Sequence, residues 1–377
     1  MTGDWQALRA LFPVTERSIY FNHAAVSPPP QPTIEAIAAQ LADVSQNGSV
    51  NFRQWLAVRE SARRRLAEML NAKPEQVAFV RNTSDGLSTV ANGFAWQAGD
   101  NLVAFRNDFP SNLYPWLRVR DALGIEVRFA HEVEGRVDVD ELIGLIDART
   151  RIVAISQVQY ASGFRVDLER LGRSARAHDA LLVVDVIQGL GVIPIDVGAE
   201  SVDVAAGAAH KWLLTPEGVG FLYLSARARE RIQPTLVGWT SVPNPDDYNN
   251  LEQGWNRGTL PWESGTAPMS LIHGLEASLK LLGEVGVGKI QTYLEELTDH
   301  LCERLRDTAY QIVSSRKRGE KSQIVCIRHS QHSPLELYSH LKQRNIITAP
   351  RGDRLRISPH FYNTPAEIDE FVGSLPD

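Results

Sequence analysis

One lysine stands out among the residues that could take part in chemistry. Lys211 lies in VDVAAGAAHKWLLTPEGVGFLYLS, residues 202–225, between a run of small residues and a Pro/Gly turn. A lysine amine becomes nucleophilic near neutral pH when burial or a neighbouring cation lowers its pKa. The small flanking residues would let a bulky planar partner approach the backbone. Because most lysines are simply solvated, this interpretation requires partners elsewhere in the chain.

Two polar residues close an apolar run that is typical of a central strand. The run is ALLVVDV, residues 180–186, in which Asp185 ends the strand pattern, and Gln188 follows three positions later. A carboxylate at such a place is costly unless it meets a cation or hydrogen-bond donors. Asp185 and Gln188 together would suit a ring nitrogen and a neighbouring ring oxygen. For Asp185 taken alone, a turn or helix-capping role is an equally good interpretation.

A candidate anion site opens a helical pattern. Thr83 and Ser84 begin this pattern in RNTSDGLSTVANG, residues 81–93, directly after a strand-like run. Hydroxyl groups and free N–H groups at a helix N-terminus bind phosphate well. An ordinary N-cap is the alternative. Phe109, in NDFPSNLYPW, follows a further strand, where its ring would either cover a flat ligand or fill the core.

The elements that must position these residues alternate between strand and helix patterns. The strand-like runs, separated by segments with helical apolar spacing, are QVAFVRN, NLVAFRND, IEVRFA, RIVAISQVQY, ALLVVDV and GVGFLYLS. This alternation predicts an α/β fold with a mainly parallel sheet covered by helices on both faces. In such a sheet, ligands bind beyond the carboxyl ends of the strands.

A change of pattern near residue 270 predicts a domain boundary. Beyond it we expect long helices over 269–285 and 289–309, short strands, and a last helix that begins near Thr364. We therefore predict a large domain over 31–269 and a smaller α+β domain over 270–377. The N-terminal segment over 1–30 would pack with the small domain.

Composition excludes several functional classes. The chain has 377 residues, 43% of them hydrophobic and 22% charged, with a formal net charge of -6, which is ordinary for a globular protein. A mildly acidic chain lacks the positive surface of a nucleic-acid binder and would be repelled by an anionic membrane. No signal peptide or apolar span is visible, so we expect a cytoplasmic protein. Cys302 and Cys326 have no metal-ligand spacing; we expect both to be packing residues, and no metal site.

The motifs jointly resemble the class V aminotransferase family of fold-type I enzymes that depend on pyridoxal 5'-phosphate (PLP). That family includes cysteine desulfurases, selenocysteine lyases, kynureninases and isopenicillin N epimerase-like proteins. The likeness rests on Asp185-x-x-Gln188 followed by His210-Lys211, and it extends over YFNHAAVSPPP, VRNTSDGL, FPSN, VQYASG, ESGTAP and LRISPHFYNTPAEIDEF. It implies a fold-type I transferase with PLP as cofactor.

The resemblance implies a role for each matched residue. Lys211 would hold the cofactor as a Schiff base and move the Cα proton, while Asp185 and Gln188 would bind the ring nitrogen and ring oxygen. The other cofactor-binding residues would be Thr83, Ser84 and His210 at the phosphate, with Phe109, Tyr160 and Trp239 around the ring. Thr266 would reach the phosphate of a neighbouring subunit, so a homodimer with shared active sites is implied. The substrate would be bound by Arg356 at its α-carboxylate, and by Arg351, His23 and Ala24.

Departures from the family pattern bear on the reaction. Desulfurases and selenocysteine lyases carry a nucleophilic cysteine in the interval that reads TAPRGDRLR here, which has none. His210 stands where kynureninases have a tyrosine, Tyr160 where desulfurases have an asparagine, and Ala208 where a serine would bind phosphate. We therefore expect a small amino acid as substrate and transamination as the leading activity. A β-lyase acting on a sulfur-containing amino acid is the second interpretation, an epimerase the third, and a non-catalytic PLP-binding or regulatory protein the last.

Overall fold

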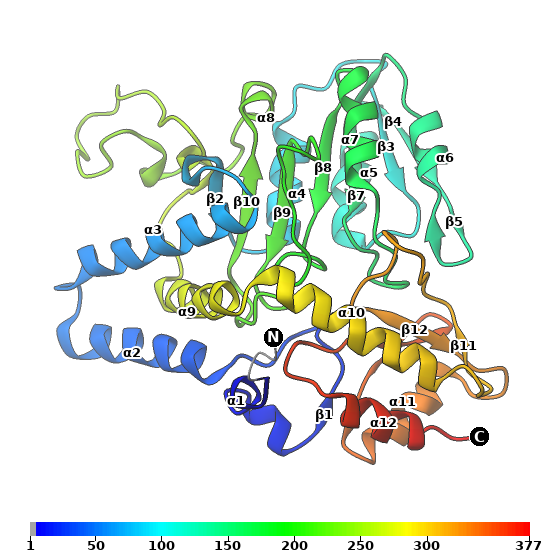
Figure 1. Cartoon of the computed structure of the whole chain (residues 1–377). Helices are drawn as coiled ribbons and strands as arrows, with labels where there is room; N and C mark the ends of the chain where they lie inside the picture. The colour runs from blue at the N-terminus through cyan, green and yellow to red at the C-terminus, as the bar shows by residue number, and fades with distance from the viewer. Residues whose placement is uncertain (1–4) are drawn as a thin grey trace.

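The computed structural model describes residues 5–377 and is built around a seven-stranded sheet (Figure 1). In spatial order its strands are β2 (Val77–Val80), β10 (Gly220–Leu224), β9 (Val204–Ala208), β8 (Leu181–Asp185), β7 (Thr150–Ser156), β3 (Asn101–Phe105) and β4 (Glu126–Ala130). Strand β10 runs antiparallel to both of its neighbours, β2 and β9, and the other six strands of this sheet run in one common direction. The predicted α/β fold with a mainly parallel sheet is confirmed.

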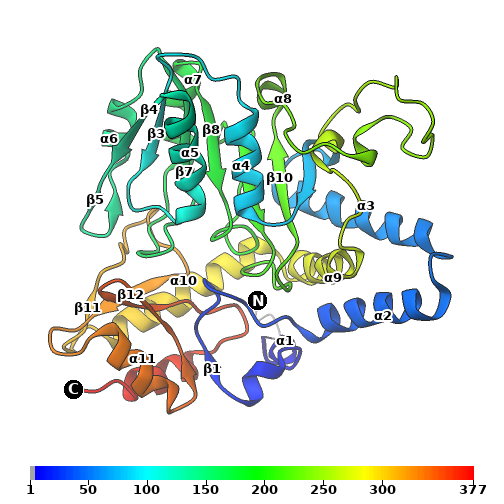
Figure 2. The same ribbon diagram turned by 180° about the vertical axis from the view of Figure 1, so that it is seen from behind.

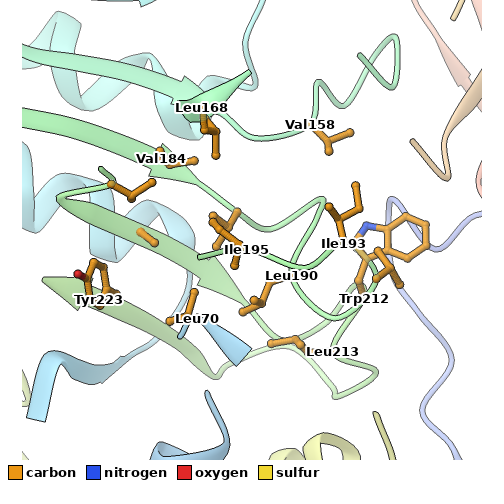
Figure 3. Packing of buried hydrophobic residues seen from close by; sticks show 14 of the residues in the cluster. Leu70, Val158, Leu168, Val184, Leu190, Ile193, Ile195, Trp212, Leu213 and Tyr223 are labelled. Atoms are coloured by element: carbon orange, nitrogen blue, oxygen red, sulfur yellow. The ribbon is translucent and has the colours of Figure 1, made fainter. Parts of the chain in front are cut away.

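Helices cover both faces of the sheet, because successive strand residues point to opposite sides. Val103 and Phe105 belong to one core, whereas Leu102 and Ala104 belong to the other. The first core is closed by α3 (Phe52–Met69), α6 (Val139–Gly144), α7 (Leu168–Ala177) and α9 (Met269–Val285), and the second by α4 (Thr83–Gly93), α5 (Tyr114–Leu123) and α8 (Ala226–Arg231). The view from behind shows α4 and α5 in front of the sheet (Figure 2). Part of the first core is drawn in Figure 3.

A second, antiparallel sheet lies toward the C-terminus. Its strand order is β11 (Gln311–Ile312), β12 (Val325–Arg328), β15 (Arg354–Ile357) and β14 (Ala349–Arg351). The helices of this region are α10 (Val287–Arg304), α11 (Pro334–Lys342) and α12 (Pro365–Gly373). Near the N-terminus, β1 (Ile19–Tyr20) pairs in parallel with β13 (Ile346–Ile347). The remaining α-helices are α1 (Trp5–Arg9) and α2 (Gln31–Asn47). The remaining strands, β5 (Glu132–Val133) and β6 (Arg136–Val137), form a hairpin.

The two long helices that follow residue 268, α9 and α10, pack against different parts of the chain. Helix α9 contacts α2 and α3, whereas α10 contacts α12. The division into 1–30, 31–269 and 270–377 stays a prediction. Among residues 5–377, no helix has both the length and the apolar character needed to cross a membrane.

Strand β9 was not predicted, although it leads directly to the candidate lysine. Its sequence, VAAGA, consists mainly of residues with low strand propensity. The strand is fully buried between β8 and β10, where small residues are required. A Cβ on Gly207 would lie 2.8 Å from the Phe221 ring. Tertiary packing therefore imposes the strand that local propensity does not favour.

Candidate active site

A cavity of about 270 Å³ lies where strands β2, β8 and β9 end. The sequence-predicted residues that line it are Ala24, Thr83, Ser84, Phe109, Tyr160, Asp185, Gln188, His210, Lys211, Arg351 and Arg356. A larger cavity of about 660 Å³, between α7 and residues 318–320, is lined by none of the predicted site residues. The carboxyl ends of the strands thus bring most of the predicted residues to one place, as the fold requires.

Lys211 is buried in the wall of this cavity, in the turn that follows the end of strand β9 at Ala208. Its side chain lies against Phe109, with Nζ 5.3 Å from the centre of the ring. The pKa of Lys211 is lowered to about 8, chiefly by burial; the positive charges of Arg356 and Arg351 contribute to this shift, and Asp185 opposes it. A lysine with this pKa is present in part as the free amine near neutral pH, and can accept a proton.

Asp185 closes strand β8 and is 1% exposed. Its Oδ1 accepts a hydrogen bond of 2.9 Å from the backbone N–H of Ile187. The pKa of Asp185 is raised to about 7, chiefly by burial; the nearby Asp108 contributes to the rise, while the N–H of Ile187 and the charge of Lys211 oppose it. A cationic group placed in the cavity beside Asp185 would stabilise its charged form.

Asp108 is a site-supporting residue that the sequence analysis missed. It lies just before Phe109 and accepts hydrogen bonds from the backbone N–H and the hydroxyl of Ser156, at 2.9 and 2.6 Å. It also accepts from the N–H of Phe109 and the amide of Asn112. These bonds fasten the loop that carries Phe109 to the end of β7. Asp108 was visible in NDFPSN, but its partner Ser156 lies 48 residues away in the chain.

The side-chain amide of Gln188 is held in one orientation. Its Oε1 accepts a bond of 2.9 Å from the indole N–H of Trp212, and its Nε2 donates to the carbonyl of Ala24 at 3.0 Å. An indole N–H can only donate, so it fixes which end of the amide is the oxygen. The second N–H of Nε2 is left to donate to another acceptor.

The first turn of α4 forms a cradle of donors beside the cavity. Asn82 caps the helix by accepting from the N–H of Asp85 at 2.9 Å, which places Thr83 and Ser84 at the first helical positions. Within the described chain, the Thr83 hydroxyl is buried without a hydrogen-bond partner. Ser84 shares a bond of 2.7 Å with Ser111, a cavity-lining residue that was not predicted. The helix N-terminus and these hydroxyls suit an anion.

Arg356 enters the cavity from β15 and is 1% exposed. It donates to the carbonyl of Tyr160 at 3.0 Å and to Oδ1 of Asn22 at 3.3 Å, while its buried Nε has no partner among residues 5–377. The pKa of Arg356 is lowered to about 9, chiefly by burial, and the positive charge of Arg351 contributes to this shift. A guanidinium held only by neutral acceptors is ready to bind a carboxylate.

Three predicted residues do not line the cavity. His23 is fully buried, with Nδ1 2.8 Å from the carbonyl of Ser358 and Nε2 2.6 Å from the Tyr362 hydroxyl. Trp239 is 44% exposed and Thr266 is exposed. The role predicted for Thr266 involves a neighbouring subunit, so it stays a prediction, as do the roles of His23 and Trp239.

Neither cysteine is placed as a nucleophile in the cavity. Cys326 is buried in β12, donates from Sγ to the carbonyl of Ala161, and has its pKa raised to about 11 by burial. Burial also raises the pKa of Cys302, which lines a separate hollow beside α10. A thiol with a raised pKa is a poor nucleophile. No group of three potential metal ligands occurs among the residues that the structure describes.

The fold and this cavity define a class of enzyme, and comparison with known proteins gives the family. Residues 19–371 match the family described as Aminotransferase class-V, to which the chain therefore belongs. It is 28% identical to a probable cysteine desulfurase from Methanothermobacter thermautotrophicus, over 98% of this chain and 97% of that protein. It is also 28% identical to isopenicillin N epimerase from Amycolatopsis lactamdurans, with 94% of each chain covered. The apo structure of a cysteine desulfurase from Thermococcus onnurineus NA1 shares the fold, with a TM-score of 0.89 and 24% identity over 99% of this chain and 97% of that chain.

The protein is thus a PLP-dependent enzyme, and its cavity fits that cofactor. The buried Thr83 hydroxyl, which has no hydrogen-bond partner among the described residues, lies at a helix N-terminus, where a phosphate can bind. The buried carboxyl of Asp185 suits a ring nitrogen, and the oriented amide of Gln188 supplies a donor. Lys211 supplies a buried amine with a lowered pKa.

Replacing Thr83 by alanine is expected to weaken PLP binding by about ten-fold, since one hydrogen bond to a charged group is worth roughly 1.5–3 kcal/mol. The Kd can be measured by titrating the cofactor-free protein and following visible absorption. Thr89→Ala, on the same helix but away from the cavity, serves as the control and should leave the Kd unchanged. An unchanged Kd for Thr83→Ala would show that its hydroxyl does not contact the phosphate.

Replacing Lys211 by methionine is expected to stabilise the cofactor-free protein at pH 7 by about 3 kcal/mol. Burial lowers the pKa of Lys211 from 10.5 to about 8, so the folded state resists protonation of this amine. The advantage of the variant should be complete below pH 8 and should vanish as the pH approaches 10.5. Urea unfolding at pH 7 and pH 10 measures it, with the exposed Lys280→Met as control. Equal stability at pH 7 would contradict the lowered pKa.

Proposed function

We propose that this enzyme is an aminotransferase that acts at Cα of a small amino acid. The observation that carries the proposal is the buried amine of Lys211, which has a pKa of about 8 and lies in one cavity with Asp185 and Arg356. When bound, PLP withdraws into its ring the electron pair that is released at Cα. Lys211 removes the Cα proton and returns a proton during the transfer of the amino group.

The other cavity residues hold and orient the reacting groups in this proposal. Asp185 binds the ring nitrogen, Gln188 donates to the ring oxygen, and Phe109 covers the ring. Thr83, Ser84 and His210 bind the phosphate, and Arg356 binds the α-carboxylate. Supporting this assignment are the unpartnered Thr83 hydroxyl, the fixed amide of Gln188 and the unpartnered Nε of Arg356, all within the described chain.

The state of the two thiols supports transamination over persulfide chemistry. A persulfide-forming enzyme needs an accessible thiolate at the substrate, whereas Cys326 is buried with a raised pKa and Cys302 lies outside the cavity. Transamination needs the proton transfers that Lys211 can perform and the hydrolysis of a C=N bond by water, and it requires no protein thiol.

A β-lyase acting on the C–S bond of a sulfur-containing amino acid is the second candidate. It is favoured by the 28% identity to a probable cysteine desulfurase over nearly the whole chain. Lys211 would again remove the Cα proton, and the sulfur group would leave without attack by a protein thiol. An epimerase ranks third, on the likeness to isopenicillin N epimerase.

We also propose a homodimer with shared active sites, in which Thr266 reaches the partner's phosphate site. Large apolar side chains that are exposed in the single chain support it. They lie on α2 and in the connection after β10, and include Leu41, Val44, Tyr248, Leu251 and Trp255. Burying such a surface would stabilise a dimer.

A panel of amino acids, incubated with the PLP-loaded enzyme and analysed for products, tests the proposal. For an aminotransferase we expect a keto acid from the amino acid, and transfer of the amino group to an added keto acid acceptor. Pyruvate and ammonia formed without an acceptor, together with sulfide from cysteine or cysteine persulfide from cystine, would instead establish the lyase. Loss of optical activity alone would establish the epimerase.

A further inference from the structure

Three arginines project from one face of the C-terminal sheet. Arg351 on β14 is the Cα partner of Arg354 on β15, and Ala349 is the partner of Arg356. Side chains of directly opposed residues lie on the same face of a sheet, as do those two positions apart along a strand. Arg351, Arg354 and Arg356 therefore share a face. Arg351 and Arg356 are diagonal neighbours, roughly 7–8 Å apart at the backbone.

Only one of the three has its charge balanced by the protein. Arg354 forms ion pairs with Glu132 and Asp353. Among residues 5–377, neither Arg351 nor Arg356 has a carboxylate within 4.0 Å. The one side-chain bond found for Arg351 goes to the adjacent carbonyl of Pro350, at 2.7 Å. Both unbalanced arginines line the cavity that holds Lys211.

Partly buried cations without counter-charges are costly, unless a ligand supplies the anions. In the proposed function the phosphate of PLP binds at the N-terminus of α4, and the carboxylate of Asp185 pairs with the ring nitrogen. Neither anion is therefore free to balance the two arginines. The other titratable groups that interact with the two arginines are the hydroxyls of Tyr160 and Tyr20, the thiol of Cys326 and the amine of Lys211, none of which is a carboxylate. An α-carboxylate at Arg356 balances one cation and leaves Arg351 without an anion.

We infer that the substrate is an amino acid whose short side chain carries a second anionic group, which Arg351 binds while Arg356 binds the α-carboxylate. This inference rests on the proposed function and narrows its substrate class. It also assigns to Arg351 a part in substrate specificity, because neutral amino acids of the same length would leave its guanidinium unpaired.

Two ligands that differ by one carboxylate test this assignment without any turnover. Succinate and butyrate have the same number of carbons and no amino group, so their binding to the PLP-loaded protein can be measured by calorimetry. We expect succinate to bind at least about ten-fold more tightly than butyrate, as one additional partly buried ion pair would give. In Arg351→Met the two ligands should bind alike, with the affinity for butyrate unchanged.

Arg354→Met is the matched control, since it removes the same charge from the same sheet face but from an arginine that the protein already pairs. It should keep the preference for succinate, whereas Arg356→Met should weaken both ligands. The visible absorption of bound PLP shows that each variant keeps an intact cofactor site. Equal affinities for succinate and butyrate in the natural protein, or a preference that survives Arg351→Met, would overturn the inference.

Turnover then distinguishes among anionic side chains. Aspartate and cysteine sulfinate should each be used with a kcat/KM at least about ten-fold above that of alanine, and this ratio should collapse in Arg351→Met. Which of the two is preferred identifies the anionic group. A higher kcat/KM for alanine would overturn the inference while leaving the proposed aminotransferase intact. Failure of the protein to bind PLP, by contrast, would refute the proposed function itself.

Discussion

Lys211→Ala is expected to lower the rate of Cα proton exchange by at least about 10³-fold, because the variant lacks the group proposed to move that proton. In the described part of the chain, no other lysine lines the cavity. The pKa of about 8 makes this amine an effective base near neutral pH. The measurement is the replacement of the Cα proton by deuterium in D₂O, followed by NMR for each amino acid that the panel identifies as a substrate.

Added amines distinguish a missing base from a damaged fold. Methylamine is small enough to enter the space that alanine leaves, and should restore part of the exchange rate in Lys211→Ala. Lys280→Ala, which changes a lysine that is 58% exposed, should exchange as the natural protein does. Exchange at the natural rate in Lys211→Ala would remove Lys211 from the proposed role.

Helices and strands with a clear pattern of apolar residues could be predicted from the sequence. The segment 269–285 was expected to be a long helix, and α9 spans Met269–Val285. The apolar run that ends in Asp185 was expected to be a buried strand, and every residue of β8 is buried. Local pattern is sufficient for these elements because α9 buries one apolar stripe in the first core, and β8 buries its two faces in the first and second cores.

Strand β9 shows where local reasoning fails. Alanine and glycine carry little information about strand formation, so VAAGA indicates only room for a ligand when the sequence is taken alone. The strand exists because β8 and β10 pair with it on both sides, and because Phe221 leaves no space beside Gly207. Such a requirement depends on residues far away in the chain and leaves no periodic pattern in the strand itself.

The reactive residues of the site could be predicted from the sequence, but the contacts that orient them could not. Asp185, Gln188 and Lys211 belong to a motif, and the structure brings them into one cavity. The contacts that orient them join distant segments, such as the bond from Gln188 to the carbonyl of Ala24, 164 residues away. Trp212 is visible in the sequence as the neighbour of Lys211, but its bond to Gln188 can be seen only in the folded chain.

Asp185→Asn is expected to lower the rate of Cα proton exchange by about 10²–10³-fold, even at saturating PLP. Asparagine has nearly the same shape, but its neutral amide cannot balance a positive charge on the ring nitrogen, so the ring accepts electrons less readily. The Kd for PLP should rise by about ten-fold or more, as expected for a lost buried charge pair. Exchange in D₂O and the absorption titration measure the two effects. An exchange rate within about two-fold of the natural enzyme would refute the proposed contact with the ring.

The same substitution should make the cofactor-free protein more stable, which separates a functional carboxylate from a structural one. Burial raises the pKa of Asp185 from 3.8 to about 7, so the folded state holds its proton more tightly than the unfolded chain does. The natural protein therefore loses stability relative to the variant as the pH rises from about 4 to 7, by about 4 kcal/mol in total. Urea unfolding at pH 4.5 and pH 8 measures the difference, with the exposed Asp353→Asn as control. If Asp185 were needed for folding, Asp185→Asn would instead lower the free energy of unfolding at pH 8, and activity would be lost together with stability. We therefore expect Asp185→Asn to gain stability while it loses affinity for PLP and Cα proton exchange. Only a carboxylate that is retained for the cofactor would give this combination.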